Sequence, residues 1–136
     1  MNDFTLPHDL VIKDSKKLVP YNEALAHMED VVEKIINHEH PQEIWFLEHD
    51  NLYTKGTSAK PEELLQQHSF PVYNAGRGGR YTYHGPKMRI IYLMLDLNKQ
   101  ESIGKDVRKY VFSLEQVVIN TLAYFSIKAE RRKDRI

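Results

Sequence analysis

The sequence predicts an α/β or α+β domain in which helices flank a mixed β-sheet. In two stretches, residues 24–36 and 107–125, apolar residues recur three and four positions apart, the spacing that gives a helix one apolar face. Short apolar runs, of which residues 44–47 and 89–95 are the clearest, have the length and composition of β-strands. Because helical stretches are interspersed with strands, a mixed sheet covered by helices is the expected architecture.

The first half of the chain is expected to hold one helix among short strands. Residues 10–12 form an apolar run before polar residues, which indicates an edge strand, and a helix is expected from about Pro20 to near Asn37. Residues 44–47 are wholly apolar, which favours a strand covered on both faces, and residues 52–54 are expected to form the returning strand. The apolar face of the helix comprises Ala24, Leu25, Met28, Val31, Val32, Ile35 and Ile36.

The second half is expected to hold further strands and a second helix. Pro61–Leu65 predicts one or two helical turns, with proline at a tolerated first position. The second helix is expected to run from about Lys105 to Ser126, with residues 127–129 beginning another strand. Three more strands are expected over residues 70–73, 81–83 and 89–95, the last being the longest apolar strand.

Composition limits the classes of function. The 136 residues suit one domain over residues 1–136, and the 19 basic residues balance the 19 acidic ones, which argues against binding nucleic acid through bulk charge. No cysteine is present, which excludes disulfides, thiolate metal sites and a cysteine nucleophile within these residues. Acidic residues near the start and the lack of an apolar run of about 20 residues predict a cytoplasmic protein that does not span a membrane.

The most irregular stretch is Gly76-Arg77-Gly78-Gly79-Arg80, between two expected strands. Glycines permit positive φ and close approach of a backbone or ligand, and arginines can hold a carboxylate, phosphate or carbonyl oxygen. The plain interpretation is a hairpin-like connection with solvated arginines, followed by a structural His84. The spacing fits neither a P-loop nor a dinucleotide-binding loop, and a single Arg-Gly-Gly is weak evidence for RNA binding.

Residues 77–86, which read Arg-Gly-Gly-Arg-Tyr-Thr-Tyr-His-Gly-Pro, closely resemble the signature of the lipoyl(octanoyl) transferases, also called lipoate-protein ligase B. The signature of that family runs Arg-Gly-Gly, two variable residues, Thr, an aromatic residue, His, Gly, Pro. Residues 45–49, 92–97 and 107–122 also resemble the family's neighbouring strands and helix. The resemblance therefore spans nearly the whole chain.

The resemblance implies a fold shared with biotin and lipoate protein ligases, and transfer of octanoyl from acyl carrier protein to a lysine. The acceptors would be the lipoyl-accepting domains of 2-oxoacid dehydrogenase and glycine cleavage proteins. The implied chemistry passes through a cysteine thioester assisted by a lysine and needs no cofactor, metal, nucleic acid or membrane. The implied substrate-binding residues are Arg77, Gly78, Gly79, Arg80, Tyr81, Thr82, Tyr83 and His84.

Two departures from the family pattern bear on activity. The family continues Gly-Pro-Gly-Gln after the histidine, whereas this chain has Lys87 and Met88 at the last two positions. In the family, the activating lysine and the nucleophilic cysteine lie beyond the position that matches Ile136. We therefore expect an N-terminal portion of the catalytic domain, truncated and incomplete, with no catalytic residue of its own and no activity alone.

Two alternatives remain open from the sequence. In the first alternative, the chain is a non-catalytic remnant or a binding half that needs a separate C-terminal piece. A nucleic-acid binder would use Arg77, Arg80 and the basic residues Arg131, Arg132, Lys133 and Arg135.

Overall fold

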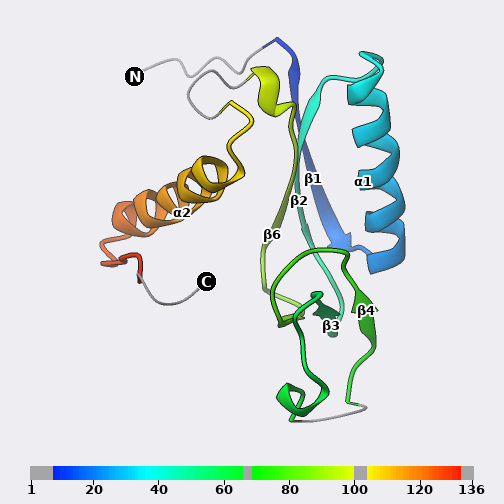
Figure 1. Ribbon diagram of the computed structural model, residues 1–136, viewed down its shortest axis with the longest axis vertical. Helices are drawn as coiled ribbons and strands as arrows, with labels where there is room; N and C mark the ends of the chain where they lie inside the picture. Colours follow the sequence, from blue (N-terminus) through cyan, green and yellow to red (C-terminus); the bar gives the residue numbers. More distant parts are fainter. Residues whose placement is uncertain (1–7, 66–68, 100–103, 133–136) are drawn as a thin grey trace. The chain divides into compact units, whose positions relative to one another are not determined.

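The computed structural model describes residues 8–65, 69–99 and 104–132, which fall into two units, Met1–Leu95 and Asp96–Ile136 (Figure 1). Each unit is described by itself. The first holds β1 (Leu10–Leu18), α1 (Tyr21–Ile36), β2 (Gln42–Glu48), β3 (Leu52–Lys55), the 3-10 turn η1 (Pro61–Glu63), β4 (Val72–Asn74), β5 (Tyr81–His84) and β6 (Ile90–Met94). The second holds the 3-10 turn η2 (Leu97–Lys99) and α2 (Val107–Tyr124).

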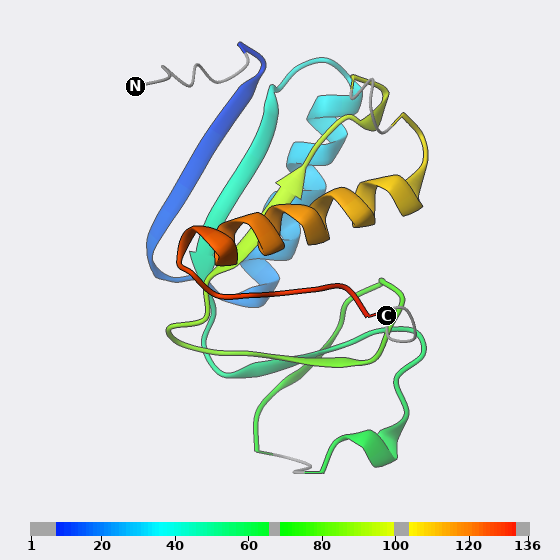
Figure 2. The same ribbon diagram turned by 90° about the vertical axis from the view of Figure 1, so that its left-hand side faces the viewer.

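The strands of the first unit form two mixed sheets of three strands each. In the order β1-β2-β6, β1 runs parallel to β2 and β6 antiparallel to it; in the order β4-β3-β5, β4 runs parallel to β3 and β5 antiparallel to it. Figures 1 and 2 show the second sheet beyond one end of the first. The expected mixed sheet and flanking helix are confirmed, with the strands divided between two sheets.

Three strand predictions need correction or extension. Residues 52–54 do not return beside residues 44–47, because the chain turns at the buried His49 and β3 enters the second sheet. The edge strand β1 has nine residues rather than three and is the longest strand, whereas β6 has only five. In β2, Trp45 and Leu47 are buried but the residues that alternate with them are only half-buried, so one face is covered more deeply than the other.

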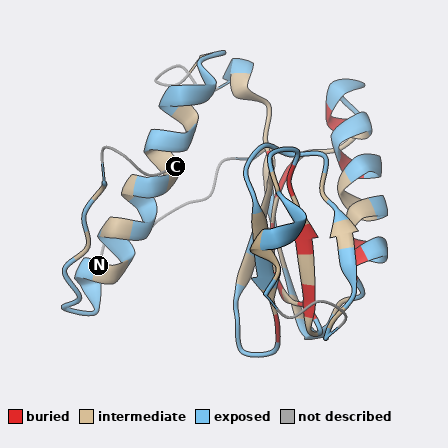
Figure 3. Ribbon diagram, turned by 60° about the horizontal axis from the view of Figure 1, so that its bottom comes forward, coloured by how far each residue is buried: buried red, intermediate tan, exposed pale blue. Residues whose placement is uncertain are grey.

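Helix α1 covers that deeper face. Ala24, Val31 and Ile35 pack with Trp45, Leu47 and Met94 in one apolar cluster, and Figure 3 shows buried residues on both the strand and the helix. The predicted apolar face was partly wrong, since Val32 is 42% and Ile36 70% exposed. The buried residues of α1 are Tyr21, Ala24, Val31 and Ile35, which form a stripe along the helix that leaves out Val32 and Ile36. The buried stripe is therefore narrower than the apolar face that the sequence predicted.

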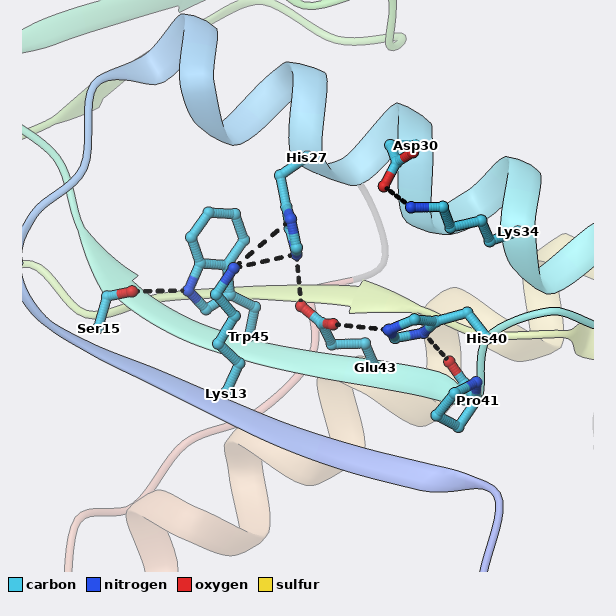
Figure 4. Close-up of polar contacts among 9 residues, drawn as sticks. All are labelled: Lys13, Ser15, His27, Asp30, Lys34, His40, Pro41, Glu43 and Trp45. Atoms are coloured by element: carbon cyan, nitrogen blue, oxygen red, sulfur yellow. Dashed lines mark hydrogen bonds and ion pairs between the residues drawn. The ribbon is translucent and has the colours of Figure 1, made fainter.

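A polar cluster fastens α1 beside this core (Figure 4). Glu43 on β2 is only 3% exposed, and its carboxylate accepts a hydrogen bond from His27 Nε2 on α1 at 2.7 Å. His40 Nε2 lies 3.9 Å from the second carboxylate oxygen. Lys13 Nζ lies 3.2 Å from His27 Nε2 and 4.0 Å from the centre of the Trp45 ring. One buried carboxylate thus ties α1 and the following loop to β2, and Lys13 of β1 joins the cluster through His27 and Trp45.

The second unit confirms the predicted second helix but not the strand after it. Asp106 caps α2 by accepting hydrogen bonds from the backbone of Arg108 and Lys109, and the helix exits near Ser126, where φ is 62°. No strand forms at residues 127–129, because the segment folds back and Arg131 donates to Glu115 and to the Phe112 carbonyl. No residue of α2 is buried. Among the described residues, no helix is both long enough and apolar enough to cross a membrane.

Candidate functional site

The glycine-arginine loop lies at the end of the β4-β3-β5 sheet. Because β4 and β5 are the two outer strands, the loop at residues 76–80 crosses the end of β3 instead of closing a hairpin. The segment after β3 meets it through three backbone hydrogen bonds, from Gly56 N to Arg80 O at 3.2 Å, Thr57 N to Arg77 O at 2.9 Å and Ser58 N to Gly79 O at 3.1 Å. The hairpin-like interpretation is therefore wrong, and the loop is held on a scaffold of backbone bonds.

Glycine is required at two points of this crossing. A Cβ on Gly56 would lie 2.7 Å from the Gly78 carbonyl oxygen and closer still to that of Gly79. Gly79 itself has φ 85°, in the left-handed region that residues with a side chain avoid. Gly78, in contrast, has open space where a Cβ would be. Two backbones therefore approach closely here, while the middle of the loop faces outward.

Arg77 is bound within the loop rather than held free for an anion. Its guanidinium donates to Thr54 Oγ1 at 2.7 Å and to Thr82 Oγ1 at 2.9 Å, which links β3 to β5. It also donates to the carbonyl oxygens of Gly78 at 2.9 Å and Arg80 at 3.3 Å. A planar side chain with five N–H donors suits this bracing role, which a lysine could not fill.

The second loop arginine is also paired, which weighs against the nucleic-acid alternative. Arg80 forms an ion pair with Glu63 of η1, although its side chain remains exposed. Of the basic residues near the end of the chain, Arg131 pairs with Glu115 and stacks on Phe112, Arg132 is exposed, and Lys133 and Arg135 lie outside the described residues. A surface for phosphates needs cations whose donors are free to reach them.

The eight predicted site residues do not share one face. Strand alternation places Thr82 and His84 on the face of β5 that carries Arg77's contacts, where Thr54 and Leu52 of β3 are buried. Tyr81 and Tyr83 point to the opposite face. There Tyr83 contacts the rings of Tyr53 and Phe70 and donates to Asn51, and a pocket of about 420 Å³ lies beside Tyr53, Tyr81 and Tyr83. Only the first face brings the predicted polar residues together.

On that first face His84 meets a second, fully buried histidine. The rings of His84 and His49 are 5.8 Å apart at an interplanar angle of 86°. His49 Nδ1 donates to the Val19 carbonyl at 2.6 Å, and the Tyr92 hydroxyl donates to His49 Nε2 at 2.8 Å. His84 Nδ1 is buried without a hydrogen-bond partner in the described structure. Leaving such an atom unpaired costs about 1 to 3 kcal/mol, so this nitrogen needs an explanation.

Burial keeps these groups uncharged. It lowers the pKa of His49, against the raising effect of the bond to Val19. It lowers the pKa of His84 as well, and the neighbouring His49 and Arg77 act in the same direction. Burial also raises the pKa of Tyr92 far above its ordinary value. The site therefore offers neutral imidazoles and a neutral phenol near neutral pH.

A larger pocket lies near the histidines, although neither His49 nor His84 lines it. Its volume is about 570 Å³, and it shares Tyr21 and Leu52 with them, since the Tyr21 ring lies 5.6 Å from that of His49 and Leu52 pairs with His84. Asn22, Asp50 and Asn51 add polar groups to its walls. The remaining walls are mainly apolar and comprise Leu18, Val19, Pro20, Phe70, Pro71 and Tyr73. In the described parts of the chain, no three His, Asp or Glu side chains are grouped to hold a metal ion.

Lys87 occupies the third position of a β-turn that follows His84. Met88 N donates to the Gly85 carbonyl at 3.1 Å, Pro86 occupies the second position, and Lys87 has φ 69°. Proline followed by a positive φ is the pattern of a type II β-turn, whose third position favours glycine. Lys87 therefore has a left-handed backbone at the position where the resemblance led us to expect glycine.

Sequence reasoning gave no site role to His49, Tyr92 or Gly56. A signal for His49 was present, because it continues the alternation of the buried Trp45 and Leu47 and so points to the covered face. Tyr92 alternates in the same way with Ile90 and Met94, but its hydroxyl partner lies 43 residues away and has no local signature.

Comparison with known proteins gives a consistent result. Residues 20–135 match the model of the lipoyl protein ligase A/B catalytic domain. The chain is similar to proteins named octanoyltransferase: it is 52% identical to that of Bartonella quintana over 124 residues, which are 91% of this chain and 49% of that protein. It is 52% identical to that of Bartonella bacilliformis over 97% of this chain and 54% of that protein, and to that of Cereibacter sphaeroides (strain ATCC 17025) over 88% and 53%. The chain thus spans about half the length of these curated relatives.

Proposed function

Because the chain belongs to the lipoyl protein ligase A/B catalytic domain family, we propose that it supplies the acyl-binding half of an octanoyltransferase. In this proposal residues 1–136 are a single, incomplete catalytic domain. The face formed by Arg77, Thr82 and His84 receives the thioester carbonyl of octanoyl-acyl carrier protein. The acceptor is a lysine of a lipoyl-accepting domain, and a cysteine and a lysine from outside these residues complete the site.

The buried, unpartnered His84 Nδ1 carries this proposal. A neutral imidazole can donate one hydrogen bond to a carbonyl oxygen, which gains negative charge as a thioester is attacked. The nearby pocket of about 570 Å³, whose walls are mainly apolar, is large enough for an eight-carbon chain.

The reaction divides into two balanced steps. A cysteine thiolate attacks the donor thioester, the carbon–sulfur bond of the donor breaks, and the carrier leaves as its thiol after taking a proton. The lysine amine then attacks the new cysteine thioester, forms the amide and returns the thiol. Since the chain has no cysteine, its own residues bind and orient the acyl group and perform neither bond exchange.

The exposed apolar surface of α2 favours a second candidate, a binding half that a separate polypeptide completes. Val107, Val117 and Val118 are 57% to 63% exposed, and Phe112 is 56% exposed. Apolar surface of this kind marks interaction sites. Co-expression with the C-terminal half of the Bartonella quintana relative tests it: restored octanoyl transfer supports complementation, and unchanged solubility with no transfer supports a remnant.

The acyl-binding role is tested with S-octanoyl pantetheine and the full chain. We expect the compound to shift the imidazole NMR signals of His84, and the His84→Phe variant to bind at least fivefold more weakly, about the effect of one hydrogen bond. His38→Asn is the control, because that exposed residue has φ 61°, which asparagine tolerates. Equal binding by all three proteins would contradict the proposal.

Two further parts of the proposal have their own tests. Mass spectrometry after incubation with octanoyl-acyl carrier protein should detect no covalent octanoyl adduct on this chain, and a stable adduct would overturn the assignment of the nucleophile to another segment. A cytoplasmic location is also proposed, and cell fractionation with an antibody to the chain would test it.

A further inference from the structure

His49 packs against His84, and Tyr92 packs against His49. Both residues belong to segments other than the glycine loop. Tyr92 is on β6 of the first sheet, His49 follows β2, and His84 ends β5 of the second sheet. The three rings follow one another, with 5.8 Å between the centres of Tyr92 and His49 and 5.8 Å between those of His49 and His84. The two sheets thus meet through a row of polar rings.

The partners of His49 define its tautomer. A carbonyl oxygen only accepts hydrogen bonds, so the 2.6 Å contact to Val19 places a proton on Nδ1. Nε2 then carries the lone pair, and the Tyr92 hydroxyl at 2.8 Å donates to it. Because His49 is 0% exposed, no water is available to replace either partner. The imidazole is held in one orientation and one neutral form.

His84 lacks such partners of its own. Its Nδ1 has none in the described structure. The groups around the ring are the His49 imidazole, nearly perpendicular to it, and the cation of Arg77, while the Tyr21 and Tyr92 phenols pack on His49. Arg77 is committed to Thr54 and Thr82 and does not hydrogen-bond the ring. The position of His84 therefore depends on the ring packed against it.

We propose that Tyr92 is a positioning residue that acts through His49: its hydroxyl fixes the His49 ring, and that ring holds His84 with Nδ1 turned to the thioester carbonyl. The inference rests on the proposed function, because it assigns a task to His84 in that site. Tyr92 touches neither the loop nor, in this scheme, the reacting atoms. Its loss changes the mobility of the two histidine rings, whereas a purely structural residue would change only stability.

The test is the imidazole NMR of the full chain, which needs no turnover. Long-range ¹H–¹⁵N spectra should show His49 as the neutral Nδ1–H tautomer in the wild type. In Tyr92→Phe the Nε2 partner is gone while the Val19 carbonyl still holds the Nδ1 proton, so we expect the same His49 tautomer in a more mobile ring, altered His84 signals, and S-octanoyl pantetheine binding weakened about fivefold. Tyr53→Phe is the matched control, because Tyr53 contacts Phe70 and Tyr83 on the opposite face.

The outcomes separate the inference from the proposed function. Unchanged His84 signals in Tyr92→Phe overturn the inference, whatever the binding result. Changed His84 signals with weakened binding support it. If the wild type fails to bind the thioester, the proposed function fails, and the assigned role of Tyr92 fails with it even when the ligand-free His84 signals respond. If Tyr92→Phe does not fold, His49→Asn replaces it, because the shorter side chain leaves the His84 ring without its packed neighbour.

Discussion

The guanidinium of Arg77 donates a hydrogen bond to the Thr54 hydroxyl at 2.7 Å, which ties the glycine loop to the strand it crosses. Replacing Arg77 by lysine removes the fork that reaches both threonines and two carbonyls at once. We expect Arg77→Lys to lower the free energy of unfolding by about 1 to 2 kcal/mol in urea titrations. Arg80→Lys is the control, since its exposed pair with Glu63 contributes little; equal losses in both variants would contradict the bracing role.

Gly56 provides a second test of the loop contact. A Cβ there meets the carbonyl groups of Gly78 and Gly79, which are backbone and cannot move without breaking the crossing. Gly56→Ala should therefore destabilise the protein by about 2 kcal/mol or more in chemical denaturation. Gly78→Ala adds the same methyl group to open space and should change stability by less than about 0.5 kcal/mol.

Lys87 is a position where substitution should stabilise. With φ 69° it bears backbone strain that glycine does not, although glycine gains more entropy on unfolding. We expect Lys87→Gly to raise the free energy of unfolding by about 0.5 to 1 kcal/mol. Lys87→Ala removes the charge but retains the Cβ, so it should give no such gain. A similar gain in both variants would assign the effect to the lysine charge.

The buried Glu43 of β2 and the exposed Asp30 of α1 give a matched pair of carboxylates (Figure 4). Removing the Glu43 carboxylate leaves His27 and His40 without their common partner, so Glu43→Ala should cost about 2 kcal/mol, less than for a fully enclosed pair because His27 reaches solvent. Asp30→Ala breaks only the exposed pair with Lys34 and should leave the melting temperature nearly unchanged.

Acid should destabilise the protein through the buried His49 and the half-buried His84. Their pKa values are lowered in the folded state, so below about pH 6.5 the unfolded chain binds protons that the folded chain does not. Stability then falls as pH falls, by at most about 1.4 kcal/mol per pH unit for each histidine. Urea titrations at pH 7.5 and 5.5 should show a smaller loss for His84→Gln than for the wild type, and equal losses would rule out His84 as a source.

Local patterns predicted the elements better than their partners. The spacing of residues 24–36 and 107–125 predicted both helices, and the apolar run at Ile44–Leu47 predicted β2. Periodicity cannot tell which sheet a strand enters, so β3 was misassigned. The rotation of α1 depends on what fills the core, which is why Val32 and Ile36 were wrongly placed on its buried face.

In the candidate site too, local features were predictable from the sequence and long-range contacts were not. The glycine loop and His84 carried a sequence signature, and alternation along β5 then separates Thr82 and His84 from Tyr81 and Tyr83. The tie between His49 and Tyr92 joins residues far apart in the chain, and the role of Gly56 follows from contacts with the loop 22 and 23 residues later. Such contacts exist only in three dimensions, and no local pattern encodes them.

The crossing of β3 by the loop sets a minimum length for this segment. A connection between the outer strands of a three-stranded sheet must span two strand spacings, about 10 Å, whereas a hairpin spans one. Backbone hydrogen bonds from Gly56, Thr57 and Ser58 also fix the course of the loop, so it cannot be shortened without breaking them. Deletions within residues 76–80 would therefore pull β4 or β5 out of register, while insertions at the outward-facing Gly78 would meet open space, so that natural length variation here should run in one direction only.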